Sequence, residues 1–292
     1  MVDNIIKVIQ DSCIVISELI RTKHSGDLSC IVDSNVSGDE VKQLDLLSNK
    51  ILLDSLLTCE NVRNVGSEEE DDLIPTNNET APYLVCYDPL DGSSNIDCNI
   101  TVGTIFGIYK YENNCIKSGR SIVCAGYCLY GGSTQFIVAT ELGAKMYLLD
   151  NNKFKLINDN LTIKEKSNVY SINESNKHKW NDPRYKLFTE HCISNNYTAR
   201  WVGSLVGDAH RTIIKGGFFA YPADKKSPNG KLRVLYEALP FAFIFKIVGG
   251  HSSNGELDSL LDLKIPENTH QKTPLILSSK YEYNIFANLN YS

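Results

Sequence analysis

The stretch YLVCYDPLDGSS, residues 83–94, narrows the fold and the chemistry more than any other part of the sequence. Its first five residues are apolar or aromatic, which predicts a short buried strand that stops at Asp88 and Pro89. Asp88 and Asp91 lie three residues apart, and two carboxylates held that close repel each other unless a cation lies between them. Carboxylate oxygens are the ligands that Mg²⁺ and Mn²⁺ prefer. The stretch therefore predicts a divalent-metal site at the end of a strand.

Small residues follow the second aspartate. Gly92, Ser93 and Ser94 predict a turn at the start of a helix, where backbone N–H groups can hold a phosphate. The same residues also fit an ordinary turn with a helix cap, because Asp-Gly-Ser is common in turns. Taken by itself the stretch supports both interpretations about equally, so the decision depends on the other carboxylates.

Other acidic residues have two interpretations each. Glu68 and Glu69 lie in an acidic run that, by itself, better fits a solvated loop. Asp45 lies beside the apolar stripe of an expected helix and is, taken singly, an ordinary boundary residue. Glu237 lies in a largely apolar stretch, where an unpaired carboxylate is costly. Its alternative is an ion pair with Arg233, four residues earlier.

Hydrophobic periodicity indicates a mixed α/β (α+β) chain in layers. The polar stretch 151–167 is the expected boundary between an N-terminal domain, residues 1–161, and a C-terminal domain, residues 162–292. Residues 22–38 have the composition of a mobile loop. The pattern predicts strands at 83–87, 104–109, 121–130, 135–140, 145–149 and 218–221, and helices at the start of the chain, from about residue 39, and at 182–195, 204–215 and 231–248.

Bulk composition excludes several classes of protein. The 292 residues carry a formal net charge of −6 and no block of Lys or Arg, so binding to nucleic acid is not expected. No stretch approaches the roughly 20 apolar residues of a membrane span. The first residues do not resemble a signal peptide. The 9 cysteines lack a Cys-x-x-Cys pair and fit reduced, buried thiols, so we expect a cytoplasmic protein.

Several segments together resemble one family. They are KQLDLLSN (42–49), YDPLDGSSNIDC (87–98), VGTIFGIY (102–109), VGSL (202–205) and KKSPNGKLR (225–233), the last followed by LYE (235–237). They are similar, in the same order, to the signature of the fructose-1,6-bisphosphatases. The DPLDGS core is shared with the wider inositol-monophosphatase superfamily, whereas the SPNGKLR block is typical of a narrower group of proteins. The resemblance implies a layered α-β-α-β-α sugar phosphatase fold and a homotetramer.

The resemblance also implies the roles of individual residues. The reaction would be Mg²⁺-dependent hydrolysis of the 1-phosphate of fructose 1,6-bisphosphate, with two to three ions, Mn²⁺ or Zn²⁺ being alternatives. The implied metal ligands are Glu68, Glu69, Asp88, the carbonyl of Leu90, Asp91 and Glu237. The implied catalytic residues are Asp45, Glu69 and Asp39, the last in a mobile loop. The implied substrate-binding residues are Gly92, Ser93, Ser94, Asn173, Tyr221, Lys231, Arg233 and, from a neighbouring subunit, Arg200.

Two departures from the family pattern affect the far-phosphate pocket. Asn176 and Trp201 stand where many family members have tyrosine. The altered pocket raises sedoheptulose 1,7-bisphosphate as an alternative substrate. A non-catalytic sugar-phosphate sensor is less favoured, because the acidic set is complete. An inositol-phosphate phosphatase is less favoured, because it would not need Lys231 and the PNGKLR segment around it. Pro82 and Lys110 replace residues with which relatives bind AMP, so inhibition at that site is expected to be lost or weak.

Overall fold

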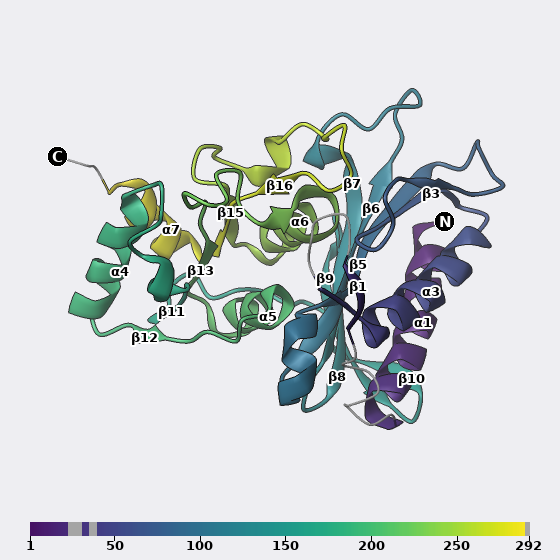
Figure 1. Ribbon diagram of the computed structural model, residues 1–292, viewed down its shortest axis with the longest axis horizontal. Helices are drawn as coiled ribbons and strands as arrows, with labels where there is room; N and C mark the ends of the chain where they lie inside the picture. Colours follow the sequence, from purple (N-terminus) through teal and green to yellow (C-terminus); the bar gives the residue numbers. More distant parts are fainter. Residues whose placement is uncertain (23–30, 35–39, 290–292) are drawn as a thin grey trace.

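The computed structural model describes residues 1–22, 31–34 and 40–289, arranged as alternating layers of helix and sheet (Figure 1). An eight-stranded sheet has the order β10-β9-β8-β7-β6-β5-β3-β4, and a five-stranded sheet has the order β12-β11-β13-β17-β15. Three apolar cores separate the layers. The predicted α-β-α-β-α architecture is therefore confirmed.

The first helical layer consists of α1 (Val2–Thr22) and α3 (Gln43–Leu57), which cover one face of the large sheet. The predicted first helix is confirmed, with Ile5, Ile9, Cys13 and Ile16 buried as expected. The second helix was expected from about residue 39 but begins at Gln43, because β2 (Glu40–Lys42) pairs with β1 (Ile31–Ser34). The expected loop at 22–38 lies mostly outside the described residues, as does Asp39.

The large sheet contains the strand on which the sequence analysis centred, β5. Its strands are β3 (Val62–Ser67), β4 (Ile74–Pro75), β5 (Tyr83–Asp91), β6 (Val102–Lys110), β7 (Ile122–Tyr130), β8 (Thr134–Thr140), β9 (Gly143–Asp150) and β10 (Lys153–Asn158). Only the β3–β5 pair is parallel among the described pairs of this sheet. Every residue of β5 is buried. Its expected end at Asp88 was wrong, because pairing with β6 resumes at Asp91 beyond a register irregularity.

The middle layer packs between the two sheets and contains α5 (Leu205–Lys215) and α6 (Leu239–Val248). The prediction of a continuous helix at 231–248 was wrong for the first part of this range. Leu232–Arg233 forms β14, which pairs with β16 (Lys272–Thr273), and Val234–Ala238 forms a π-helical turn, η4. Pro240 lacks an N–H, so the regular α-helix forms only around and beyond it. Gly249 ends α6 at φ 88°, as the glycine pair predicted.

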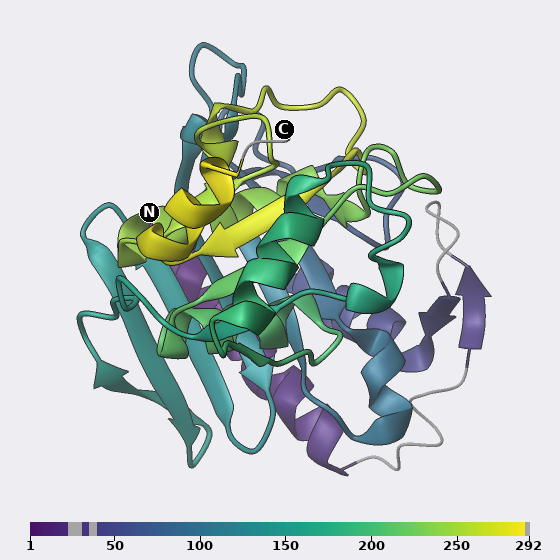
Figure 2. The same cartoon turned by 90° about the vertical axis from the view of Figure 1, so that its left-hand side faces the viewer.

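The small sheet and the outer helices complete the layers. Its strands are β11 (Val169–Ser171), β12 (Thr198–Ala199), β13 (Phe218–Tyr221), β15 (His251–Ser253) and β17 (Leu275–Ser278). In Figure 2, α4 (Arg184–Ser194, green) and α7 (Lys280–Ala287, yellow) lie on the side of this sheet that faces the viewer. Short 3₁₀ turns are η1 (Ser93–Cys98), η2 (Gly119–Ser121), η3 (Glu174–Asn176) and η5 (Leu260–Asp262).

The expected domain boundary at residues 161/162 falls between β10 and β11, and it stays a prediction. β10 lies within the stretch expected to be only a polar connection. Within the described residues, none of the helices has the length and apolar character needed to cross a membrane.

Candidate active site

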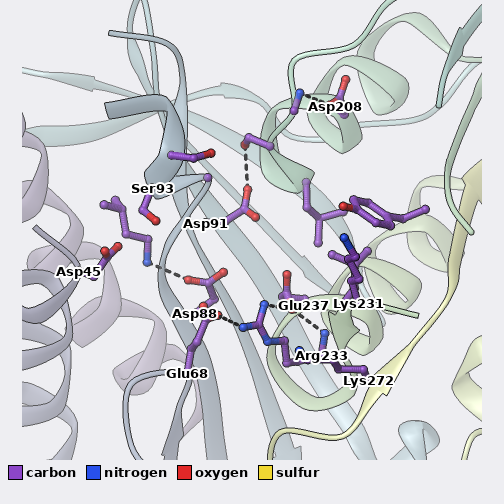
Figure 3. Close-up of a pocket in the computed structure, with 18 of the residues that line it drawn as sticks. Asp45, Glu68, Asp88, Asp91, Ser93, Asp208, Lys231, Arg233, Glu237 and Lys272 are labelled. Atoms are coloured by element: carbon purple, nitrogen blue, oxygen red, sulfur yellow. Dashed lines mark hydrogen bonds and ion pairs between the residues drawn. The ribbon is translucent and has the colours of Figure 1, made fainter. Parts of the chain in front are cut away.

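A pocket of about 630 Å³ lies between the end of β5 and the middle layer (Figure 3). It gathers side chains from β5, η1, α3, η4 and the loops that follow β3 and precede β14, segments far apart in the sequence. Its predicted lining residues are Asp45, Glu68, Glu69, Asp88, Leu90, Asp91, Gly92, Ser93, Ser94, Tyr221, Lys231, Arg233 and Glu237. Most of the site expected from the sequence is therefore in one place.

The end of β5 is fixed by hydrogen bonds to both halves of the molecule. The Leu90 N–H donates to Asp88 Oδ1 at 2.9 Å. Asp91 Oδ2 accepts from the Ser204 hydroxyl and from the Val206 N–H, both at 2.8 Å. Gly92 has φ 81°, and a Cβ there would lie 2.7 Å from the Ser204 Cβ. The turn therefore needs glycine both for its backbone conformation and for its contact with Ser204.

Three buried carboxylates converge behind this turn. Asp88, Asp91 and Glu237 each offer an oxygen within 4.8 Å of the others. Burial, and then the charges of its acidic neighbours, raise the pKa of Asp88 well above its usual range. Burial raises the pKa of Asp91 to about 6 and that of Glu237 to about 8. Carboxylates that resist ionisation together form a donor set that a hard divalent cation would satisfy.

Glu68 and Glu69 face the pocket from the loop after β3, whereas Asp71 and Asp72 of the same acidic run are exposed. The solvated-loop interpretation thus holds only for the end of the run. Burial and the neighbouring Glu68 raise the pKa of Glu69 to about 8.

Arg233 brings a positive charge into the acidic group. Its Nη2 lies 2.7 Å from Glu68 Oε1, and its Nη1 lies 3.8 Å from Glu237 Oε2. The ion pair considered as an alternative for Glu237 therefore exists, and it exists within the carboxylate group. The Arg233 guanidinium partly neutralises acids that would otherwise repel one another. A metal cation would be stabilised by the same negative charge, so the residues fit a metal.

Asp45 lies at the start of α3, beside the acidic group. Its Oδ2 accepts from the Lys42 N–H at 2.7 Å. Burial raises the pKa of Asp45 to about 7 despite this hydrogen bond, and the nearby Glu68 raises it further. A carboxylate with such a pKa is suited to accepting a proton near neutral pH.

The opposite end of the pocket is aromatic and basic. Trp201 lines it and stacks on Phe219 with ring centroids 6.2 Å apart and planes at 9°. Tyr221 lies 6.2 Å from the Trp201 ring. Lys231 points into the same region (Figure 3). Trp201 therefore forms part of the wall where the sequence analysis noted a departure from the family.

Three residues discussed for this end do not line the pocket of the single chain. Asn173 accepts from the Ser175 hydroxyl at 2.6 Å, at the start of η3. Asn176 accepts from Lys179 Nζ at 3.1 Å. Arg200 is exposed and donates to its neighbour Ala199 O at 3.1 Å.

Sequence reasoning missed some residues of the pocket. Lys42 forms an ion pair of 2.9 Å with Asp97 at the pocket's edge, and Lys272 and Asp208 also line it. Ser204 holds Asp91 across the layers. Its position at the first residue of an expected helix signals a cap, and its side chain does accept from the Gly207 N–H. That signal does not reveal the contact with Asp91, which depends on the tertiary fold.

The layered fold and the acidic pocket at a glycine-serine turn fit a metal-dependent phosphatase. The chain belongs to the fructose-1,6-bisphosphatase family: residues 2–159 match the model "Fructose-1-6-bisphosphatase, N-terminal domain", and residues 163–290 match the corresponding C-terminal domain. The resemblance found in the sequence is confirmed.

Relatives and solved structures agree with this membership. The chain is 42% identical over 282 residues to a class 1 fructose-1,6-bisphosphatase of Sulfurihydrogenibium sp. (strain YO3AOP1), covering 94% of this chain and 87% of the relative. It is 41% identical over 274 residues to fructose-1,6-bisphosphatase 1 of Bos taurus, covering 88% and 79%. The structure of Leishmania major fructose-1,6-bisphosphatase in holo form superposes with a TM-score of 0.91 at 36% identity, covering 97% and 92%.

Proposed function

We propose that this protein hydrolyses the 1-phosphate of fructose 1,6-bisphosphate to fructose 6-phosphate and phosphate in a Mg²⁺-dependent reaction. The observation that carries the proposal is the distribution of charge along one pocket. Buried carboxylates lie at one end, beside Gly92 and Ser93, and the positively charged Lys231 lies at the other end. Such a pocket suits a substrate with a phosphate at each end. The names of the relatives support the same substrate.

The acidic residues would hold two to three ions. Glu68, Glu69, Asp88, Asp91, Glu237 and the carbonyl of Leu90 are the proposed ligands, and all six residues line the pocket. Oxygen donors favour Mg²⁺ over softer ions, with Mn²⁺ or Zn²⁺ as alternatives. Bound divalent ions would neutralise phosphate charge and make water a better nucleophile.

The protein's own groups would orient the phosphate and move the proton. The backbone N–H groups of Gly92 and Ser93, with the Ser94 hydroxyl, are proposed to hold the phosphoryl oxygens. Asp45, with a pKa of about 7, is proposed to take the proton of the attacking water, assisted by Glu69. Asp39 is proposed as a further acid, and it lies outside the described residues.

The far phosphate would be bound by Tyr221 and Lys231, which line the pocket, and by Asn173. Arg233, which pairs with Glu68, would contact the substrate from the acidic end of the pocket. Arg200 is proposed to reach the site of a neighbouring subunit, since it is exposed in the single chain. A site shared between subunits requires an oligomer, and we propose a homotetramer.

We further propose a cytoplasmic location and a division of the chain into two domains at residues 161/162.

Trp201 favours a second candidate, sedoheptulose 1,7-bisphosphate. Its indole donates only through one N–H and offers no hydroxyl to a phosphate. Asn176 is bonded to Lys179 rather than directed into the pocket. With fewer hydroxyl donors at this end, binding depends less on the exact position of the far phosphate. The pocket could then accept the phosphate of a longer sugar.

One experiment tests both candidates. Phosphate release would be measured from the two bisphosphates side by side, with Mg²⁺ and with a chelator, and with and without AMP. We expect Mg²⁺-dependent release from fructose 1,6-bisphosphate that AMP inhibits weakly or not at all. Release from neither substrate would refute the proposal, and a strong preference for the seven-carbon sugar would establish the second candidate.

A further inference from the structure

His270 connects the two segments that carry the acidic end of the pocket. Its Nδ1 lies 2.7 Å from the hydroxyl oxygen of Tyr236, and its Nε2 lies 2.9 Å from the backbone carbonyl oxygen of Glu70. Tyr236 directly precedes Glu237 in η4, and Glu70 directly follows Glu69. One imidazole, on the loop before β16, therefore touches both segments.

The carbonyl partner fixes the direction of one hydrogen bond, and the neutral imidazole ring then fixes the other. A carbonyl oxygen only accepts, so His270 Nε2 carries the hydrogen and donates to Glu70. In the neutral ring Nδ1 then accepts from the Tyr236 hydroxyl. Tyr236 is 0% exposed, so its hydroxyl requires a partner inside the protein. The two rings meet edge to face, with centroids 5.9 Å apart at 70°.

The acidic loop is also held from its other side. Asn49 of α3 donates from Nδ2 to Glu70 Oε1 at 2.7 Å. Asn49 Oδ1 in turn accepts from the Ser67 hydroxyl at 2.7 Å and from the Tyr87 hydroxyl at 2.8 Å. Glu70 is thus held at two points: Asn49 of the first helical layer bonds its side chain, and His270 bonds its backbone carbonyl. The loop that presents Glu68 and Glu69 has little freedom to move.

We propose that His270 is a positioning residue for the metal centre, setting the spacing between the Glu68/Glu69 loop and Glu237. The inference rests on the ligand roles given under the proposed function. Groups that orient metal ligands from outside the coordination sphere typically affect metal affinity by about 10- to 100-fold. His270 acts through Glu70 and Tyr236, and it does not line the pocket itself.

The test measures Mn²⁺ binding to the full chain by electron paramagnetic resonance, without substrate. His270→Ala is expected to weaken binding by about 10-fold or more. His270→Gln is expected to recover most of this loss, because its amide offers a donor and an acceptor side by side. Hydrogen exchange of the backbone amides at 67–72, measured without metal, should rise in the Ala variant and much less in the Gln variant.

A matched control is available in His210. Its Nδ1 bonds the Tyr127 hydroxyl at 2.8 Å, with rings 5.8 Å apart at 79°, and it lies outside the pocket lining. His210→Ala should lower stability while leaving Mn²⁺ affinity unchanged. If His270→Ala behaves like His210→Ala in Mn²⁺ binding, His270 is merely structural and the proposal is overturned.

Two further outcomes separate this inference from the proposed function. Should His270→Ala fail to fold, Tyr236→Phe keeps the ring and removes only the donor, and unchanged Mn²⁺ affinity in that variant overturns the proposal. Wild-type protein that binds Mn²⁺ but releases phosphate from neither bisphosphate refutes the proposed function, and the affinity difference still decides the role of His270. Wild-type protein that binds no Mn²⁺ overturns both.

Discussion

Arg233 pairs with Glu68 at 2.7 Å inside the pocket in which Asp88, Asp91 and Glu237 converge. The side chains of the pair are 11% and 13% exposed, so water screens the pair only in part. The Arg233 backbone N–H also donates to Glu237 Oε2. One residue therefore compensates two acids that would otherwise repel each other in the metal-free protein.

Arg233→Gln should accordingly destabilise the metal-free protein. Breaking a buried ion pair costs about 3–5 kcal/mol, and partial exposure here reduces the expected loss to about 2 kcal/mol. Mg²⁺ should restore more stability to the variant than to the wild type, because the acids have lost their cation. Thermal unfolding with and without Mg²⁺ measures both effects.

Arg120→Gln is the matched control, since Arg120 pairs with Asp262 on the surface with side chains 59% and 46% exposed. Its loss should stay below about 0.5 kcal/mol, with the Mg²⁺ effect unchanged. An Arg233→Gln variant as stable as the wild type without metal would contradict the compensating role of Arg233.

The acidic residues predict an unusual dependence of stability on pH. Burial raises the pKa values of Asp45, Glu69 and Glu237 to about 7, 8 and 8, well above the ordinary carboxyl pKa of about 4. Between these limits the folded protein binds more protons than the unfolded chain, so the stability of the metal-free protein falls as pH rises through the window. Cations replace protons, and stabilisation by Mg²⁺ should therefore be larger at the upper end of the window than at the lower end.

Denaturant unfolding across this window, with Mg²⁺ and with a chelator, checks the pH prediction. Metal binding should also release protons, which calorimetry in buffers of different ionisation enthalpy detects. Metal-free stability that rises with pH over the same window would mean that these carboxylates are ionised in the folded state.

Asp91→Asn tests the assignment of metal ligands. The substitution keeps the size of the side chain, and the oxygen of the amide can still accept from Ser204 and Val206, so the fold should persist. Removing the charge of a direct ligand should lower turnover by more than about 100-fold. Substitution of a group outside the coordination sphere already lowers activity by up to about 100-fold. Phosphate release and circular dichroism would be measured together, with Asp262→Asn as the surface control. Retained turnover would remove Asp91 from the ligand set.

Much of the fold followed from local pattern. The apolar first part of β5 (residues 83–87), the amphipathic first helix and the glycine stop after α6 all carry strong short-range signals. The strand β14 and the π-turn η4 carry none, because β14 exists only through its pairing with residues 272–273, forty positions away in the chain. β10 was missed because its exposed Lys153 and Lys155 made the segment look like a loop.

The candidate site divides in the same way. Asp88 and Asp91 were found from spacing, whereas Glu68, Asp45 and Glu237 were connected to them by the resemblance to a family. The contacts that hold these groups, such as Ser204 to Asp91 and His270 to Glu70, join distant segments. No spacing or composition signals them, because they arise only when the layers pack.

Gly92→Ala tests how the turn is built. The new Cβ would meet the Ser204 Cβ at 2.7 Å, and φ 81° is unfavourable for alanine. We expect a loss of about 1–2 kcal/mol from the backbone conformation, plus displacement of Ser204 from Asp91. Both unfolding stability and turnover should fall. Gly132→Ala is the control, because a Cβ there meets nothing within 4 Å. A Gly92→Ala variant with normal turnover would show that the turn tolerates a shift of Ser204.

Trp201→Tyr addresses the choice between the two sugars. The indole stacks on Phe219 and lies against Tyr221, so a tyrosine ring can occupy the same place and present a hydroxyl. A new hydrogen bond to a charged phosphate should lower the KM for fructose 1,6-bisphosphate by about 10-fold. The KM for the seven-carbon bisphosphate should change less, and kcat should stay within a few-fold because the residue lies at the far end from the carboxylates. Trp201→Phe separates the hydroxyl from ring size and should give no such gain. Equal effects of the two substitutions on both substrates would mean that Trp201 does not determine the preference for the six- or seven-carbon sugar.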